Sequence, residues 1–207
     1  MQRRYSQEMK KVKKPKIHSK ENVLSERELK ELLNFAEDIS DELFITLAGY
    51  EGMRIGEIAH MESSWVNFQD RYIDIPATKK CDCCDCKAYR DGVWSPKTQY
   101  GVRKIPIRVE AIDVIERYFR AYRRVGCSRQ TIFNHIKAVA KKTTITKRVY
   151  PHSLRATAAT SWGEMGVSAP TLCYIMGWND IEIANNYVKS TEESALQEIR
   201  WRENQRR

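Results

Sequence analysis

Residues 152–157 read HSLRAT, so a histidine and an arginine stand three positions apart. Apolar residues recur at helical spacing from Leu154 to Trp162 and predict a helix that ends at the glycines just beyond. On such a helix His152 and Arg155 share one face, one turn apart. A pair of this kind is usually structural when it stands alone, so its role depends on the rest of the chain.

Two other short segments bring comparable chemistry. Residues 51–57 read EGMRIGE and place Arg54 at the start of an expected helix, with Glu57 three positions on. Further along, residues 176–178 read MGW, and nine positions after this tryptophan stands Tyr187. Each segment is weak evidence by itself, because a lone arginine is mostly structural and a tyrosine near the C-terminus normally packs against the core.

Hydrophobic periodicity predicts a mainly α protein with a small antiparallel β-sheet inserted near the front. A capping box at 25–28 opens the first helix, and apolar stripes at helical spacing dominate from Val109 onward. Segments 65–68 and 72–75 are expected strands. Segment 102–107 alternates apolar and basic residues, as an edge strand with one wet face would. Further helices are expected over 41–50, 54–61, 168–176, 180–188 and 190–207.

Length, composition and charge narrow the class of protein. The 207 residues are 42% hydrophobic and 30% charged, which fits one soluble globular domain with a tail. No apolar run approaches the ~20 residues of a membrane-spanning helix, and the charged N-terminus shows no secretory signal. We therefore expect a cytoplasmic protein without a membrane partner.

The net charge of +9 is unevenly distributed. Residues 1–20 carry +7 and read as a flexible basic arm, residues 21–96 carry −8, and residues 97–155 carry +12. A folded block this basic is typical of a surface that faces a polyanion, so we expect nucleic acid as a partner. The predicted phosphate contacts within this block are Arg103, Lys104, Arg123, Arg124, Lys141 and Lys142.

The order and spacing of the three motif segments resemble the tyrosine recombinase (phage integrase) family, over about residues 22–190. In that family two arginines, a lysine, a histidine and a histidine or tryptophan surround a nucleophilic tyrosine. The resemblance implies the catalytic-domain fold of the family over 21–190. By matching positions it assigns catalytic roles to Arg54, Lys97, His152, Arg155, Trp178 and Tyr187. The family lysine lies on a β-hairpin turn, and Lys97, just before the basic strand, is its best match.

The residue types suit transesterification at a DNA phosphate. Arg54 and Arg155 can each bind non-bridging oxygens through two hydrogen bonds. The indole N–H of Trp178 can donate to a further oxygen. Glu57 is expected to orient an arginine or the histidine from behind.

Proton transfer is the second requirement of this chemistry. Tyr187 would form a covalent 3′-phosphotyrosine, and a phenol with an ordinary pKa near 10 needs help to lose its proton. His152 is the expected base or second phosphate ligand, and Lys97 would protonate the departing 5′-oxygen. Because the phosphotyrosine conserves the bond energy, no cofactor is expected for catalysis.

The resemblance also implies partners. These are double-stranded DNA attachment sites and a homotetramer on DNA, with 191–207 as a tail helix that docks onto a neighbouring protomer. The family usually has a separate DNA-binding domain before the catalytic one, whereas only the arm 1–20 precedes it here. We therefore expect either a catalytic-domain fragment or a domain supplied by a partner.

The expected function is that of a site-specific recombinase or integrase of a virus, plasmid or other mobile element. Two departures from the family pattern, Ala156 in place of His or Lys and Trp178 in place of His, are both tolerated in the family. The alternatives are a type IB topoisomerase-like relaxing enzyme and a catalytically idle DNA-binding relative. The complete catalytic set argues against the idle relative.

A cysteine-rich insertion at 80–92 stands apart from these motifs. Its thiols are Cys81, Cys83, Cys84 and Cys86. Four thiols suffice for a tetrahedral zinc, but the spacing is tighter than two paired Cys-x-x-Cys motifs. The alternative is an exposed loop with reduced thiols. Three histidines show no ligand spacing and are predicted at the surface or in the core: His18, His60 and His135.

Overall fold

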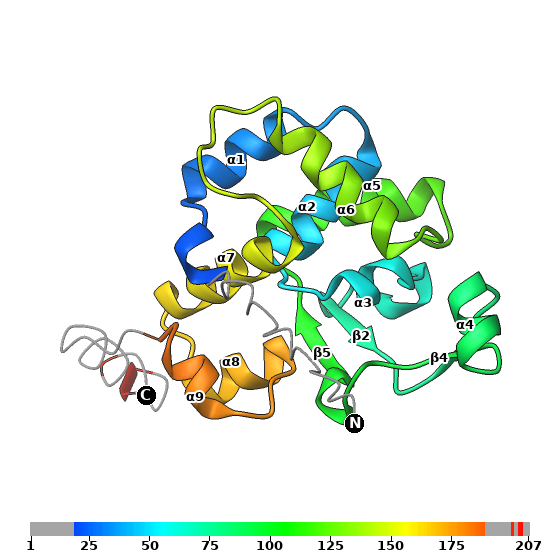
Figure 1. Cartoon of the computed structure of the whole chain (residues 1–207). Helices are drawn as coiled ribbons and strands as arrows, with labels where there is room; N and C mark the ends of the chain where they lie inside the picture. The colour runs from blue at the N-terminus through cyan, green and yellow to red at the C-terminus, as the bar shows by residue number, and fades with distance from the viewer. Residues whose placement is uncertain (1–18, 189–199, 201–202, 205–207) are drawn as a thin grey trace, which may run out of the picture.

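The computed structural model describes residues 19–188, 200 and 203–204 (Figure 1). Most of the predicted basic arm and of the tail helix therefore lies outside the described residues. The α-helices are α1 (Glu26–Asn34), α2 (Ile39–Gly49), α3 (Ile55–Ala59), α4 (Cys84–Tyr89), α5 (Val109–Ala121), α6 (Arg129–Ala140), α7 (Pro151–Glu164), α8 (Ala169–Met176) and α9 (Ile181–Asn185). Short 3₁₀ turns are η1 (Ser19–Asn22), η2 (Ser63–Trp65) and η3 (Gln99–Gly101).

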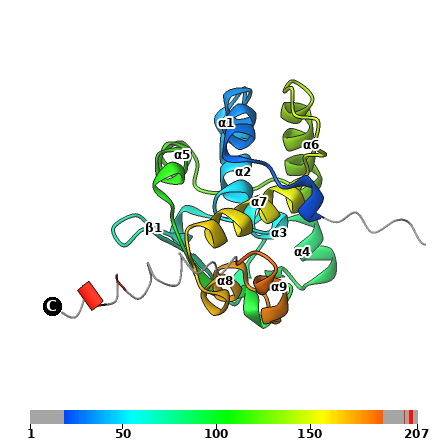
Figure 2. The same cartoon turned by 90° about the vertical axis from the view of Figure 1, so that its left-hand side faces the viewer.

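Helix α2 is the centre of the helical part. Every residue of α2 from Leu43 to Gly49 is buried, and the helix packs against α1, α5, α6 and α7 (Figures 1 and 2). A helix that is apolar on every side is stable only when neighbours cover it on every side. Its N-terminus is capped by Asp38, whose carboxylate accepts hydrogen bonds from the backbone N–H of Ser40 and Asp41.

The main sheet contains β1 (Val66–Asn67), β2 (Tyr72–Ile75) and β5 (Arg103–Pro106), antiparallel in the order β1-β2-β5. The prediction of a mainly α fold with a small antiparallel sheet is confirmed, and β5 lies at the edge as expected. Helix α8 covers that edge, where the backbone N–H of Lys104 donates to the hydroxyl of Tyr174.

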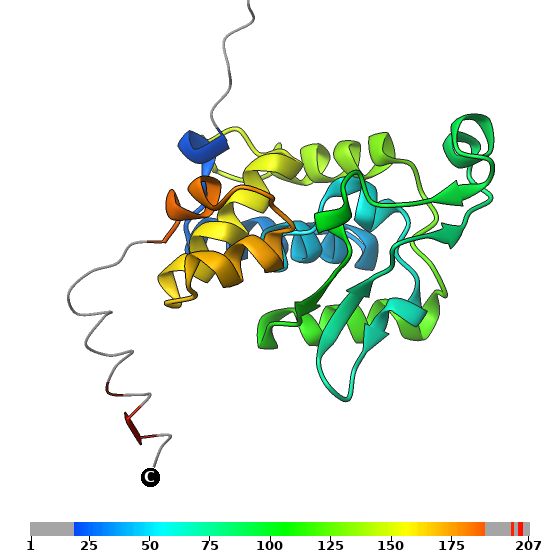
Figure 3. The ribbon, with the colours of Figure 1, turned by 90° about the horizontal axis from the view of Figure 1, so that it is seen from below.

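The connection from β2 to β5 forms a small appendage. It holds a second antiparallel pair, β3 (Lys79–Lys80) with β4 (Val93–Trp94), and α4 between them. Figures 1 and 3 show α4 at the outer edge of the molecule. The insertion therefore contains a short helix and a strand pair and is not wholly loop. Trp94 attaches the appendage to the rest of the protein. Its ring stacks on that of His60 with 5.3 Å between centroids, and its centroid lies 5.1 Å from that of Trp65.

The helices of the described part are too short or too polar to cross a membrane.

Candidate active site

Arg54 is held at the start of α3 by two elements that lie far apart in the sequence. Its guanidinium donates to Glu57 Oε1 at 2.9 Å and to the carbonyl oxygen of Gly177, at the end of α8. Gly177 has φ +61°, and a Cβ there would come within 2.7 Å of the carbonyl oxygen of Tyr100 and 2.9 Å of Arg54 Nη1. Only glycine fits this helix end. The Arg54 side chain keeps 26% of its surface exposed, so it can still reach a ligand.

Glu57 is the carboxylate on which the arginines converge. It is buried and accepts hydrogen bonds from the backbone N–H of Arg54 and from both terminal nitrogens of Arg103. Burial alone would raise the pKa of Glu57, but the charges of Arg103, Arg155 and Arg54 outweigh it and hold the pKa at about 2. The predicted supporting role of Glu57 toward Arg54 agrees with these contacts.

The prediction that Arg103 contacts DNA is wrong. Its side chain is fully buried, pairs with Glu57 and donates to the carbonyl oxygen of Ile175 at 2.7 Å. Residues 103, 105 and 107 lie on the same face of the sheet, and that face is buried. When two basic residues follow each other in an edge strand, one must point inward, and here it is Arg103 while Lys104 points out.

Arg155 projects from the first half of α7 into the same centre. Its guanidinium donates to the carbonyl oxygens of Gly52 and Met176, and it lies 5.8 Å from the ring of Trp178. Burial lowers the pKa of Arg155 to about 9. Glu57 opposes this shift, and the like charges of Arg54 and Arg103 reinforce it. Arg155 therefore remains positively charged at neutral pH.

The predicted nucleophile lies at the same tryptophan as this arginine. Tyr187 follows α9, and its ring stacks on Trp178 with 5.4 Å between centroids. Burial raises the pKa of Tyr187, and the charge of Arg155 opposes that rise. A Cβ on Gly163 would lie 2.2 Å from the carbonyl oxygen of Tyr187, so the backbone at 187 rests directly on α7. The helix ends as expected among the glycines beyond Trp162, since α7 stops at Glu164 between Gly163 and Gly166, and Gly163 in addition makes room for this contact.

His152 and Lys97 complete the predicted set. Both are exposed, His152 on the first turn of α7 and Lys97 in the loop between β4 and η3. Partial desolvation and the charges of Arg155, Arg54 and Lys97 lower the pKa of His152, which favours a neutral imidazole. Lys97 is among the charges that act on His152, so this lysine lies in the same region of the molecule.

Two other lysines near the sheet, Lys79 and Lys104, make contacts elsewhere. Lys79 is bound to Glu62 and to the carbonyl oxygen of His60, and Lys104 lies 4.4 Å over the ring of Tyr72. This leaves Lys97 as the better match for the family lysine.

Four further basic residues predicted to contact DNA are exposed. Arg124 forms an ion pair with Asp82 at 2.8 Å, and Lys142 forms one with Glu37 at 2.5 Å. These are exposed pairs that contribute little to stability and leave the cations accessible. Contact of Arg123, Arg124, Lys141 and Lys142 with DNA stays a prediction.

The cysteine insertion brings together a different set of side chains from the one predicted. Cys81, Cys83 and Cys86 converge with His60, whereas Cys84 is exposed. The prediction that His60 is an ordinary surface or core residue therefore overlooked its surroundings. No linear spacing indicates this histidine, because it lies 21 positions before Cys81, near the end of α3.

The residues matched to the family thus come together from α3, α7, α8, α9 and the loop after β4. The sequence model described as the phage integrase family matches residues 22–194, and the chain belongs to that family.

Curated relatives are longer than this chain. Tyrosine recombinase XerA of Pyrococcus horikoshii is 26% identical over 199 residues, which cover 89% of this chain and 62% of that protein. The transposase from transposon Tn916 of Enterococcus faecalis is 26% identical over 214 residues, which cover 86% of this chain and 50% of the transposase. The chain therefore spans between half and two thirds of the length of these relatives.

Solved structures share the fold. The crystal structure of XerA recombinase superposes with a TM-score of 0.63 at 23% identity, covering 87% of this chain and 62% of that one. The Tn1549 transposon integrase in complex with transposon right end DNA gives a TM-score of 0.60 at 23% identity, covering 86% of this chain and 65% of the integrase.

Proposed function

We propose that this chain breaks and rejoins DNA strands at specific sites through a 3′-phosphotyrosine intermediate, as the recombinase or integrase of a mobile element. The observation that carries the proposal is that Arg54, Arg155 and Tyr187 all meet the segment that follows α8. Arg54 donates to the carbonyl oxygen of Gly177, Arg155 donates to that of Met176, and the ring of Tyr187 stacks on Trp178. The names of the relatives, a tyrosine recombinase and transposases of transposons, agree with it.

The arginines bind the scissile phosphate. Arg54 is partly exposed and Arg155 is fixed by two carbonyl oxygens, so both are positioned before the substrate arrives. Guanidiniums held in place stabilise the negative charge that develops on the non-bridging oxygens in the transition state. Glu57, itself held by Arg103, orients the guanidinium of Arg54. The indole N–H of Trp178 donates one further hydrogen bond to the phosphate.

Proton transfer uses the remaining residues. The oxygen of Tyr187 attacks phosphorus and forms a P–O bond as the bond to the 5′-oxygen breaks. The phenol proton passes to His152, because the lowered pKa of this histidine keeps its imidazole neutral and free to accept a proton. The charge of Arg155 favours the phenolate and so opposes the rise that burial causes in the pKa of Tyr187. Lys97 gives its proton to the departing 5′-oxygen. Reversal of these steps with a second 5′-hydroxyl rejoins the strands.

The substrate and assembly belong to the same proposal. The substrate is double-stranded DNA carrying an attachment site, inside the host cell. A homotetramer brings two duplexes together. A separate DNA-binding domain, supplied by a further part of the protein or by a partner, completes the complex with DNA. The exposed basic residues of 97–155 contact the phosphates that flank the cut.

The test is covalent attachment to a nicked suicide duplex that carries the flanks of the element, followed on a denaturing gel. The wild-type chain should form the adduct, Tyr187→Phe should bind DNA without forming it, and Tyr100→Phe, a nearby exposed tyrosine, should behave as wild type. An adduct formed by Tyr187→Phe would exclude this nucleophile. Relaxation of supercoiled DNA without exchange between paired sites would replace the proposal with a topoisomerase.

A further inference from the structure

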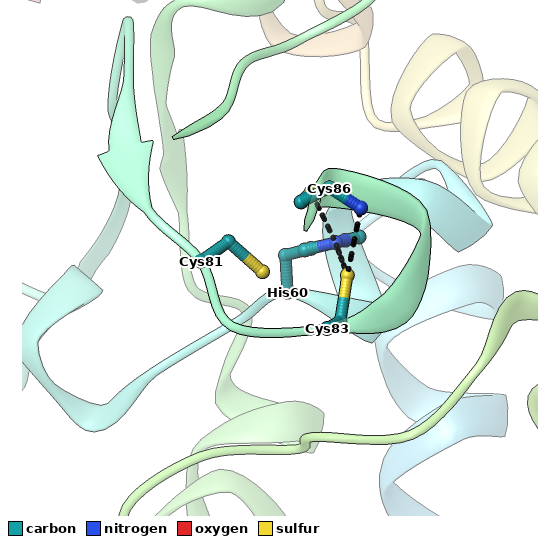
Figure 4. Close-up of side chains that lie close together, drawn as sticks. All are labelled: His60, Cys81, Cys83 and Cys86. Carbon is teal, nitrogen blue, oxygen red and sulfur yellow. Dashed lines mark hydrogen bonds between the residues drawn. The ribbon is translucent and has the colours of Figure 1, made fainter. Parts of the chain in front are cut away.

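The geometry points to a structural zinc site formed by His60, Cys81, Cys83 and Cys86 (Figure 4). One ligand atom from each of these side chains lies within 4.8 Å of every other. The histidine comes from the residue after α3, and the three cysteines come from the segment between β3 and α4 and from α4 itself. The site lies outside the arginine cluster, and the argument for it does not depend on the DNA chemistry.

The separations are those of a tetrahedral metal site. His60 Nε2 lies 3.5 Å from the sulfur of Cys83 and 3.6 Å from the sulfur of Cys86. Zinc bonds of about 2.3 Å to sulfur and about 2.0 Å to nitrogen, at the tetrahedral angle, separate the two ligand atoms by about 3.5 Å. A shared cation therefore accounts for both distances.

Hydrogen bonds to the ligands support the same assignment. Nδ1 of His60 lies 2.8 Å from the carbonyl oxygen of Gly56, which can only accept, so Nδ1 carries the proton and Nε2 presents its lone pair. Two sulfurs approach this one lone pair, and two thiols cannot both donate to it. The backbone N–H of Cys86 donates to the sulfur of Cys83 at 3.4 Å, which stabilises a thiolate there.

A hollow beside the site gives the metal a path to it. The hollow has a volume of about 360 Å³ and is lined by three of the four ligands, His60, Cys81 and Cys83. The cations that also line it, Lys79, Arg124 and Arg129, are each paired with a carboxylate. Cys84 lies at the hollow too but outside the ligand group, with its sulfur 3.9 Å from a carboxylate oxygen of Asp85.

A metal at this site would stabilise the appendage, which has little apolar core of its own. Cys86 is the one buried side chain of α4, so little apolar contact holds this helix to the body. A metal bound to His60 would fasten the end of α3 to the segment that carries α4 and leads on to β4. Small structures with little core commonly depend on such a bond.

The experiment measures metal in the full 207-residue chain, expressed with zinc in the medium and purified without chelators. Elemental analysis should find about one zinc per chain. Replacement by Co²⁺ should produce the charge-transfer bands of cobalt thiolates and the visible bands of a tetrahedral site. Removal of the metal by a chelator should increase hydrogen exchange in 79–94, and zinc should restore protection. This comparison uses the wild-type chain and needs no variant to fold.

Variants identify the ligands. Cys83→Ser and His60→Ala should lose the metal, His60→Cys should keep it with a four-sulfur cobalt spectrum, and Cys84→Ser, the matched control, should retain one equivalent. The proposal is wrong if the wild-type chain holds no metal and gives no tetrahedral cobalt spectrum. It is equally wrong if Cys84→Ser loses metal as fully as Cys83→Ser, or if the purified chain contains a disulfide among these cysteines.

Discussion

Gly163→Ala should disable cleavage while leaving the fold and DNA binding largely intact. The added methyl group would lie 2.2 Å from the carbonyl oxygen of Tyr187, and real contacts of this kind are essentially never below 3.0 Å. The backbone that carries the nucleophile must therefore retreat from α7 by about 0.8 Å. A displacement of ~1 Å at a reacting group can cost about 10²-fold in rate. Alanine is also the better helix former, by up to ~1 kcal/mol, so global stability should change little.

The rate of covalent attachment to a suicide duplex measures this effect, with DNA affinity and thermal unfolding recorded on the same samples. Gly56→Ala is the matched control, because its new methyl group would meet only Arg129 Cδ at 3.7 Å, an ordinary contact. We expect the control to cleave at the wild-type rate. If Gly163→Ala also cleaves at that rate, Tyr187 does not rest on α7 when it reacts, and the contact has no part in positioning it.

Three further outcomes follow from the same contacts. Burial raises the pKa of Glu51 to about 8 in the folded chain, so the folded state binds more protons than the unfolded state between about 4.5 and 8. The stability that this group contributes is complete below the lower value and is lost as pH rises through the upper one. Glu51→Gln should remove a decline of up to ~1.4 kcal/mol per pH unit in that window, measured by urea unfolding. Lys97→Ala should slow cleavage by roughly 10²–10⁴-fold. A substrate with sulfur at the 5′-bridging position should restore the rate, because a thiolate leaves without a proton. If this substrate rescues Lys104→Ala instead, Lys104 and not Lys97 is the proton donor. Arg103→Ala breaks a buried ion pair and should lower the free energy of unfolding by about 3–5 kcal/mol, measured by thermal or urea unfolding. Lys141→Ala should leave stability unchanged and reduce the slope of log DNA affinity against log salt by about 0.9. If Arg103→Ala changes the salt slope and not the stability, Arg103 contacts DNA after all.

Local patterns predicted the elements well where one physical signal dominated. The capping box at Ser25 and Glu28 forms as expected, and the alternation in 102–107 correctly indicated an edge strand with one buried face. The candidate catalytic residues were identified through the order of three motifs rather than through periodicity. Their spatial convergence depends on long-range contacts, such as that between Arg54 and Gly177, which no local pattern contains.

The failures concern side chains whose partners lie elsewhere in the sequence. The basic face of β5 looked suited to phosphate, but Glu57, 46 positions away, neutralises Arg103 inside the protein. In the same way His60 approaches Cys83 and Cys86 only after α3 and the appendage have folded against each other. A charge or a ligand acquires its role from what faces it, and a single sequence does not show which residues face each other.

The sharing of Glu57 by the arginines has a consequence for the heat resistance of this protein. Within the described residues, Arg54 and Arg103 pair with this one carboxylate, while Arg155 is held by carbonyl oxygens beside them. The surplus cations repel one another until a phosphate arrives. Selection for stability alone would therefore remove one of these arginines. A relative that no longer cleaves DNA should have a higher melting temperature when Arg54 is replaced. Salt should change the stability of the free protein little, because buried charges are screened only weakly, whereas it should weaken a complex with DNA.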